Sequence, residues 1–314
     1  MSKNSLKASG VILAVLVCGL ALACESRSED GRAKGTSHAL RAVPKSMRGR
    51  IIFQSRIGDS WQIVRLDLSN GARTQLTRSA GDNNHPSFSP RGDWIAYEST
   101  RDGGAPAIYR MRADGGAPER LTKGADECHS PCWRPDGAVI AYDSPRGRDY
   151  EIYGLDIATG REWQITRSIW RSILPHWSPD GSLIAFTRNE LGWGIYRMNA
   201  DGSDVKGLAT KGGSCRPDWS PDGKRIAFVS HVADGKGDIW TMDPDGGNKV
   251  RLTLDSASYD YDPAWSPDGR WIVYQSTTDK KRGPWRLNAI PATGGEAIRL
   301  SPDGADDRFP DWAF

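Results

Sequence analysis

Six side chains that can bind a ligand or move protons occupy comparable places in a repeating pattern. Each lies one to four residues before a proline that opens a repeat, and the set is His85, His129, Arg171, Arg216, Asp262 and Arg308. Histidine binds metals and exchanges protons near neutral pH, whereas arginine holds carboxylates through paired hydrogen bonds. We therefore expect these side chains to gather into one site for a ligand or a protein partner.

These six side chains favour ligand or partner binding over metal binding or catalysis. His85 and His129 belong to consecutive repeats and are expected to converge, but two histidines without a third ligand do not define a metal centre. Arg216 and Arg308 come from different repeats and are predicted to clamp a carboxylate or an acidic peptide, unless nearby aspartates already pair with them. The sequence has no Gly-x-Ser-x-Gly elbow, phosphate loop or His-Glu-x-x-His helix. We predict no catalytic residue, metal or cofactor.

The prolines open copies of a motif close to Pro-x-Trp-Ser-Pro-Asp-Gly. Five copies are followed by a shortened sixth, and they begin at Pro86, Pro131, Pro175, Pro217, Pro263 and Pro310. Repeats of about 40–50 residues are typical of propeller blades. Each copy continues with an apolar run such as Ile184-Ala185-Phe186, a piece such as Ile195-Tyr196-Arg197-Met198, and an ending such as Leu252-Thr253. This order predicts four strands per repeat, with Ser-Pro-Asp-Gly as a tight turn.

The two ends of the repeated region are out of phase with the other repeats. Ile51-Ile52-Phe53 resembles the second strand of a repeat, whereas Pro310-Asp311-Trp312 resembles a first strand and ends there. One sheet is therefore expected to combine a C-terminal strand with three N-terminal strands. We predict an all-β, six-bladed propeller with four-stranded blades over residues 51–314, closed by this exchange of terminal strands.

The repeated residues resemble those of TolB, the periplasmic protein of the Tol–Pal cell-envelope system. The likeness rests on Trp-Ser-Pro-Asp-Gly, Ile-Ala-Phe, Ile-Tyr-x-Met, Asp-Gly and Leu-Thr, and it extends over residues 51–314. Similar repeats occur in oligogalacturonate lyases and in propellers of dipeptidyl peptidases. The resemblance implies the propeller fold, but TolB carries an α/β domain where only a short polar stretch precedes Ile51. We therefore expect no role that needs that domain.

The N-terminus has the pattern of an export signal. Lys3 and Lys7 precede an apolar run from residue 11 to 23, which predicts a signal peptide over residues 1–23. The following Cys24 is predicted to be lipidated, with ordinary cleavage beside an unmodified cysteine as the alternative. Residues 24–50 are expected to form a flexible polar tether.

Charge and cysteine content limit the remaining choices. Residues 25–50 hold seven basic and three acidic residues, so the net charge of +3 originates at the N-terminus and the propeller carries an acidic excess. This distribution argues against a nucleic-acid partner. Cys132 is expected in the core. Cys128 and Cys215 precede their prolines at similar spacings, and a disulfide between them is one of two alternatives, the other being two thiols.

Two functions fit these observations. The first is a non-catalytic periplasmic lipoprotein of the cell envelope, held to the membrane by a lipid anchor, that uses one propeller face to bind an envelope protein. The second is a carbohydrate-active or sugar-binding propeller, similar to oligogalacturonate lyases, that takes a small acidic or sugar ligand in its central channel. The missing catalytic set favours the first.

Overall fold

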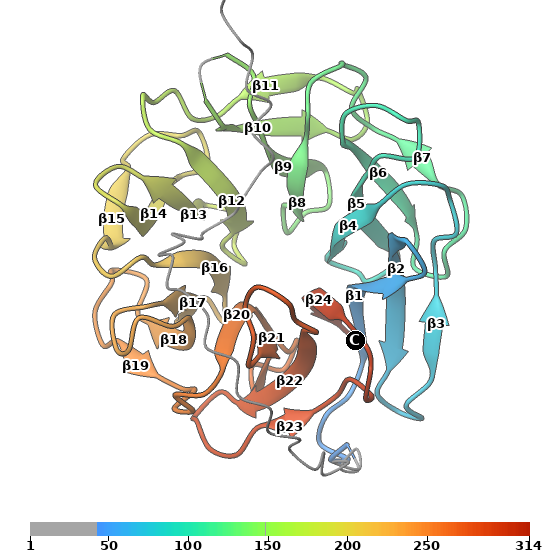
Figure 1. The fold of residues 1–314 in the computed structure, drawn as a ribbon. Coiled ribbons are helices and arrows are strands. Elements are labelled where there is room, and N and C mark those ends of the chain that lie inside the picture. Colours follow the sequence, from blue (N-terminus) through green and yellow to red (C-terminus); the bar gives the residue numbers. More distant parts are fainter. Residues whose placement is uncertain (1–42, 148) are drawn as a thin grey trace, which may run out of the picture. The chain divides into compact units, whose positions relative to one another are not determined.

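The fold is a ring of six four-stranded antiparallel sheets (Figure 1). The structure is a computed structural model that describes residues 43–147 and 149–314. In this part of the chain every regular element is a strand, and no helix is long and apolar enough to cross a membrane. The predicted all-β propeller with six blades is therefore confirmed. The signal peptide, Cys24 and most of the predicted tether lie outside the described residues.

Each sheet runs from the channel outwards through four strand positions. The inner strands are β24 (Asp307–Ala313), β4 (Asn83–Phe88), β8 (His129–Trp133), β12 (Ser172–Trp177), β16 (Cys215–Trp219) and β20 (Tyr259–Trp265). The second strands are β1 (Arg50–Ile57), β5 (Trp94–Ser99), β9 (Val139–Ser144), β13 (Leu183–Asn189), β17 (Ile226–Ser230) and β21 (Trp271–Thr277).

The third and outer strands complete the sheets. The third strands are β2 (Ser60–Asp67), β6 (Ala107–Arg112), β10 (Glu151–Asp156), β14 (Trp193–Asn199), β18 (Asp238–Met242) and β22 (Arg286–Pro291). The outer strands are short, and they are β3 (Arg73–Gln75), β7 (Glu119–Arg120), β11 (Glu162–Gln164), β15 (Lys206–Ala209), β19 (Val250–Arg251) and β23 (Ile298–Arg299).

The repeated isoleucine of the second strand forms the centre of the core. All six copies have no solvent-exposed surface, and they are Ile51, Ile95, Ile140, Ile184, Ile226 and Ile272. A second strand is covered on both faces by neighbouring sheets, so it does not alternate between apolar and polar residues. Tryptophans of the inner strands fill the space between sheets. Trp133, for example, packs with Ala96 and Ile108 of the preceding sheet.

The other repeated motif residues also have structural roles. In the Ser-Pro-Asp-Gly turn, Ser178 Oγ donates to Asp180 Oδ1 and accepts the backbone N–H of Leu183 at 2.9 Å. The hydroxyl two residues after an outer strand accepts a backbone N–H from the third strand in five sheets, through Thr77, Thr122, Thr166, Thr253 and Ser301. The motif thus builds the blades and leaves the connecting loops to carry function.

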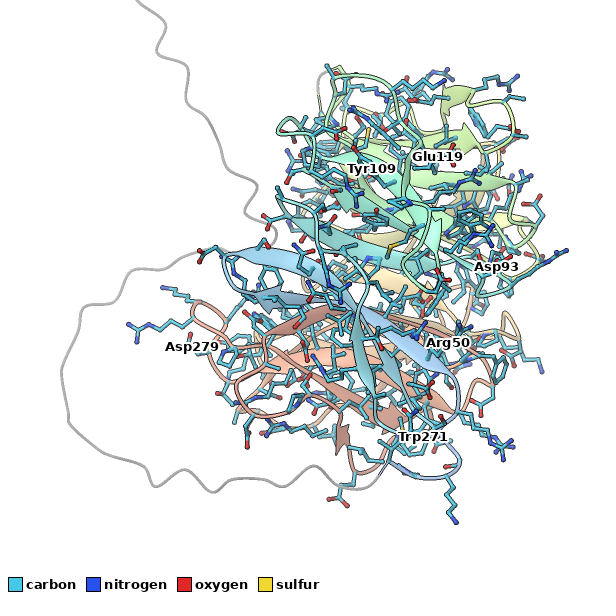
Figure 2. All side chains as sticks on the ribbon, turned by 90° about the vertical axis from the view of Figure 1, so that its right-hand side faces the viewer. Arg50, Asp93, Tyr109, Glu119, Trp271 and Asp279 are labelled. Carbon is cyan, nitrogen blue, oxygen red and sulfur yellow. The ribbon has the colours of Figure 1, made fainter. Side chains whose placement is uncertain are left out.

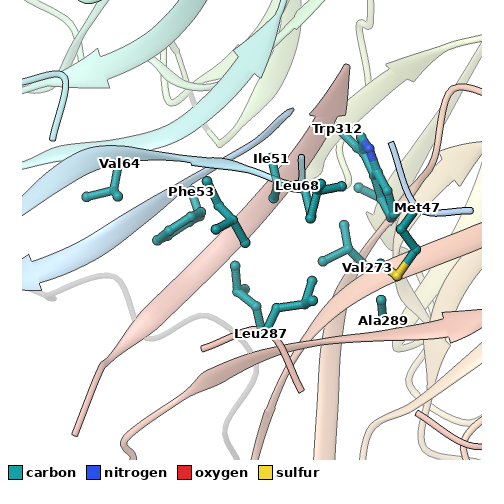
Figure 3. Packing of buried hydrophobic residues seen from close by; sticks show 12 residues of the cluster. Met47, Ile51, Phe53, Val64, Leu68, Val273, Leu287, Ala289 and Trp312 are labelled. Atoms are coloured by element: carbon teal, nitrogen blue, oxygen red, sulfur yellow. The ribbon is translucent and has the colours of Figure 1, made fainter. Parts of the chain in front are cut away.

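One sheet joins both ends of the described chain. Its order is β24-β1-β2-β3, and Trp312 lies opposite Ile51 in the register. Trp312 packs with Ile51, Leu68 and Met47, and its Nε1 donates to the carbonyl of Arg48 at 2.9 Å (Figure 3). Met47 is buried, so the end of the segment predicted as a polar tether already contacts the propeller.

This sheet should depend strongly on the indole of Trp312. We expect Trp312→Ala to lower the free energy of unfolding by about 3–5 kcal/mol, because a large buried side chain leaves a cavity. Phe314→Ala is the matched control: its side chain is 66% exposed, and the loss should stay below about 0.5 kcal/mol. Urea unfolding of both variants measures the difference, and equal losses would contradict a packing role for Trp312.

Candidate functional site

The two faces of the propeller carry different connections. On one face lie the Ser-Pro-Asp-Gly turns between inner and second strands. On the other lie the loops that join second to third strands and one sheet to the next. Figure 2 shows the propeller from the side, with Asp279 of the β21–β22 loop at one face and Asp93 of a turn at the other. We call the face with the longer loops the mouth face, because the residues before each repeated proline lie towards it.

The residue before each repeated proline has a left-handed backbone. The six φ angles lie between 45° and 61°, at His85, Ser130, Leu174, Arg216, Asp262 and Phe309. At each of these places the inner strand slips in register against the second strand, which defines a β-bulge. For a residue other than glycine this conformation costs roughly 1–2 kcal/mol, so each bulge needs compensating contacts.

The compensation comes from the preceding sheet. A polar side chain on its second strand accepts the backbone N–H of the left-handed residue, through Gln54 to His85, Glu98 to Ser130, Asp143 to Leu174, Thr187 to Arg216 and Gln275 to Phe309. The distances lie between 2.9 and 3.3 Å. Before Asp262 the equivalent position is Val229, which has no side-chain acceptor. These bonds fix five of the six bulges and tie neighbouring sheets together.

The bulges line a central cavity of about 120 Å³. Its wall holds three residues from each inner strand, namely the left-handed residue, the proline and the residue after it. The side chains therefore form two rings. We call the left-handed residues the first ring. The second ring consists of Ser87, Cys132, His176, Asp218, Ala264 and Asp311.

Four first-ring side chains meet over the cavity. Arg216 forms an ion pair with Asp262, and both side chains are only 10% exposed. The Arg216 guanidinium also lies over the ring of Phe309, 5.0 Å from its centroid, while the ring of His85 is 3.9 Å from Phe309 on a centroid basis. Burial raises the pKa of Asp262, and Arg216 opposes that shift. The predicted residues His85, Arg216 and Asp262 are thus brought together.

His85 and His129 converge, as expected, but on a carboxylate. Glu98 lies between them, with its two oxygens 3.1 Å from the Nδ1 atoms of the two rings. Burial alone would raise the pKa of Glu98, yet the two histidines lower it well below its usual range. Burial opposes protonation of His129, but Glu98 raises its pKa to about 9. Glu98 is buried, and nothing in its repeat position distinguishes it in the sequence from the equivalent Gln54 and Gln275.

Arg171 and Arg308 do not line the cavity. Arg171 pairs with Asp149 at 2.7 Å and lies over the ring of Tyr150. Arg308 pairs with Asp306 at 2.8 Å and lies over Trp61, 4.6 Å from its centroid. The predicted clamp of Arg216 and Arg308 therefore has an intramolecular carboxylate on each arginine, which was the alternative considered from the sequence.

The second ring was missed by sequence reasoning. Cys132 was expected to be a core residue, and it is buried, but it also lines the cavity. His176 and Asp218 form an ion pair at 3.0 Å inside the channel. The sequence does hold a signal for this ring, because each second-ring residue comes directly after the repeated proline of its copy. Within the described residues no group of three or more metal-binding side chains is close enough to hold an ion.

The alternative of a Cys128–Cys215 disulfide is wrong. Both residues are buried thiols, as is Cys132. Cys128 packs among side chains of the second and third sheets, with Leu121, Trp133 and Tyr153, and its sulfur lies 3.8 Å from Arg146 Nη2. Side chains that pack into the body of the propeller cannot bridge its channel.

Fold and cavity together define a class of protein: a six-bladed propeller built from Trp-Ser-Pro-Asp-Gly repeats around a central channel that holds charged side chains. Residues 123–314 match the family described as the TolB beta propeller domain. The chain belongs to this family, as the sequence motifs predicted.

Solved structures show the same likeness. TolB from Acinetobacter baumannii aligns with a TM-score of 0.73 and 25% identity, over 84% of this chain and 66% of that one. A putative TolB from Agrobacterium tumefaciens aligns with a TM-score of 0.68 and 25% identity, over 85% of this chain and all of that one. An oligogalacturonate lyase in complex with manganese, with a TM-score of 0.58 and 19% identity over 82% of this chain and 74% of that one, shares the fold alone.

Among curated proteins, an uncharacterized protein of Agrobacterium fabrum is 34% identical over 79 residues. This match spans 25% of the present chain and 26% of the relative. The chain therefore spans about a quarter of that relative and just under two thirds of the Acinetobacter TolB.

The bond that fixes each bulge can be tested at one position. Thr187→Val keeps the side-chain shape but removes the acceptor for the N–H of Arg216, and we expect a loss of about 1 kcal/mol in the free energy of unfolding. Val229→Thr places the missing hydroxyl at the equivalent position before Asp262 and should cause no loss. Urea unfolding compares the two, and a loss for Val229→Thr equal to that for Thr187→Val would contradict the assigned role.

Proposed function

We propose that the protein is a non-catalytic interaction propeller that binds a protein partner through its mouth face. The observation that carries this proposal is the placement of the most exposed aliphatic side chains. Leu191 is 91% exposed and Leu254 72%, and both lie in loops of the mouth face together with Ile169 and Val232. Aliphatic side chains gathered on one face of a rigid fold are typical of a binding surface.

A recess beside these side chains supports the same reading. It has a volume of about 280 Å³ and lies between the β12–β15 and β16–β19 sheets, where Val232, Leu208 and Phe228 form part of its wall. Such a recess can receive an apolar side chain of a partner, which is how anchor residues are held in protein interfaces. Loops on a scaffold tied together by cross-sheet bonds present this surface with little loss of entropy on binding.

The partner we propose is a protein of the bacterial cell envelope. Membership in the TolB propeller family supports an envelope location, since TolB is periplasmic. The signal-like residues 1–23 and Cys24 support export followed by lipid attachment, which would hold the mouth face near other envelope proteins.

Lipid attachment is tested at Cys24. We expect the wild-type protein to sediment with membranes, because an acyl-modified N-terminus partitions into lipid. Cys24→Ser should release the protein into the soluble fraction or leave it unprocessed, and Cys128→Ser serves as the control, since that thiol lies inside the propeller. Immunoblots of separated envelope fractions measure the outcome. Wild-type protein found wholly in the soluble periplasm would refute lipidation while leaving the binding proposal open.

Site-specific photo-crosslinking tests the mouth face in intact envelopes. A photoreactive amino acid replaces Leu191 or Leu254 on this face. The matched controls are Val205, just before outer strand β15, and Val250, at the start of outer strand β19, since these are also exposed aliphatic residues. We expect the same discrete adduct from both mouth-face positions and none from the controls. Adding Leu254→Glu to the Leu191 probe should reduce that adduct several-fold, because a charge would have to be buried.

Two results would overturn the proposal. One is an adduct that forms equally from Val205 and Val250, which would place the contact elsewhere or make it unspecific. The other is a Leu191 adduct that is unchanged by Leu254→Glu, which would show that the aliphatic side chains do not form one surface.

A further inference from the structure

Two lysines from different loops of the mouth face converge on one aromatic ring. Lys236 belongs to the loop between β17 and β18, and Lys280 belongs to the loop between β21 and β22. The Lys236 ammonium nitrogen lies 5.2 Å from the ring centroid of Tyr259, and the Lys280 nitrogen lies 5.8 Å from the same centroid. The ring attracts both cations, but their like charges repel each other. An anion bound beside this ring would interact favourably with both ammonium groups.

A chain of hydrogen bonds between two sheets fixes the position of Lys280. Burial lowers the pKa of His231, so its imidazole is neutral and only one ring nitrogen carries a proton. Nδ1 lies 2.6 Å from the carbonyl of Gly213, so this nitrogen donates. Nε2 then accepts the hydroxyl of Tyr261 at 2.6 Å, and the phenol oxygen accepts Nζ of Lys280 at 2.8 Å. The Lys280 ammonium group is therefore held in place before a partner binds.

Lys236 is fixed by contacts of its own. Its Nζ donates to the carbonyl of Ser256, in the segment between β19 and β20. The neighbouring carboxylate of Asp234 is engaged elsewhere, since Oδ1 accepts the backbone N–H of Lys236 at 2.9 Å and Oδ2 pairs with Arg251 at 2.8 Å. Two ammonium groups that are fixed in advance reduce the entropy lost when a ligand binds.

The turn that carries Lys280 presents two more cations at the mouth face (Figure 2). Asp279 Oδ1 accepts the backbone N–H groups of Lys281 and Arg282, at 3.0 and 3.1 Å. The carboxylate thus shapes the turn, while Lys281 and Arg282 are exposed to solvent. Exposed cations at the edge of a binding surface attract anionic partners and speed their association.

Aliphatic side chains accompany the lysines on the same loops. Val232 is 59% exposed and precedes Lys236 by four positions, and Leu254 is 72% exposed and precedes Ser256 by two. Val232 also borders the recess of about 280 Å³ between the β12–β15 and β16–β19 sheets. Lipid headgroups form a broad charged layer, whereas a protein segment can place a carboxylate at one ring and an apolar side chain beside a recess. The convergence of both lysines on Tyr259 therefore favours a protein.

We propose that Lys236 and Lys280 bind carboxylates of an acidic segment in the protein partner, beside the ring of Tyr259. An aliphatic side chain of the same segment contacts Val232 and Leu254. This inference rests on the proposed function, because it specifies the chemistry of the partner that the mouth face binds. Lysine ammonium groups bind carboxylates as point charges, so the attraction weakens as the salt concentration rises.

The first test measures the photo-crosslinked adduct from the Leu191 probe in intact envelopes. Lys236→Glu combined with Lys280→Glu should reduce this adduct at least about tenfold, because like charges then face each other across the interface. The matched control is Lys206→Glu combined with Lys224→Glu, since these lysines are also exposed and lie at the opposite face. The control pair should leave the adduct within about twofold.

The second test uses the purified full-length chain with Cys24→Ser, which removes the proposed acylation site. Fluorescence anisotropy compares a labelled peptide of glutamate and leucine residues with the same peptide in which lysine replaces glutamate. The acidic peptide should bind at least about tenfold more tightly, and Lys236→Glu with Lys280→Glu should abolish or reverse that preference. Added salt should weaken binding of the acidic peptide. Sedimentation with vesicles of phosphatidylglycerol and phosphatidylcholine tests a lipid surface as the alternative.

The outcomes separate this inference from the proposed function. A Leu191 adduct that Lys236→Glu with Lys280→Glu leaves unchanged overturns the inference, while the proposed function stands. If no mouth-face probe gives an adduct, the proposed function fails, and equal binding of the acidic and basic peptides then overturns the inference separately. Sedimentation with the anionic vesicles that is lost in the double variant would assign the lysines to a lipid surface and also overturn it.

A second pair of substitutions covers a loss of folding. Lys280 bonds to Tyr261, so its replacement can disturb the contact between sheets. Lys281→Glu with Arg282→Glu leaves that bond in place and should weaken binding of the acidic peptide several-fold, since these cations add to the same field. Thermal unfolding of each variant reports whether the propeller is intact. Unchanged binding in this variant, with Lys236→Gln also without effect, would contradict the inference.

Discussion

The structure depends on a hydrogen bond between sheets at the residue before five of the six inner-strand prolines. That residue has a left-handed backbone, which is unfavourable for any side chain larger than a hydrogen atom. In five sheets a polar side chain of the preceding sheet accepts its N–H and offsets part of the cost. Because the donor and the acceptor belong to different sheets, these five bonds form only when neighbouring sheets are assembled. Strain and closure are therefore coupled.

The bulges also determine which side chains line the channel. A left-handed residue followed by proline bends the inner strand and sets two side chains per sheet in the cavity wall. The wall sets charged side chains among prolines and other apolar residues, so these charges must be balanced within the channel. Arg216 neutralises Asp262, His176 neutralises Asp218, and Glu98 is shared by His85 and His129. Buried charges are tolerated in proteins when they are paired in this way.

The loops of the mouth face and the wall of the channel carry different kinds of side chain. The mouth face has exposed aliphatic side chains on loops, which suit a large partner and are free to vary because the sheets do not need them for packing. The second ring lies inside the channel, in the wall of a cavity of about 120 Å³.

The sequence by itself determined the architecture, because the blade motif is local. Each Pro-x-Trp-Ser-Pro-Asp-Gly copy contains its own turn, buried isoleucine and capping hydroxyl, so the repeat length and the phase of the termini were enough to predict six sheets and their strand order. It also indicated that His85 and His129 would converge. The partners of these side chains were decided only by the tertiary structure. Glu98 joins His85 of its own sheet to His129 of the next sheet, Asp262 pairs with Arg216, and Asp218 pairs with His176. Apart from the pair within one sheet, these contacts join residues more than 30 positions apart across a boundary between sheets, because the ring curves. That curvature arises from the packing of large side chains between sheets, which no single repeat encodes.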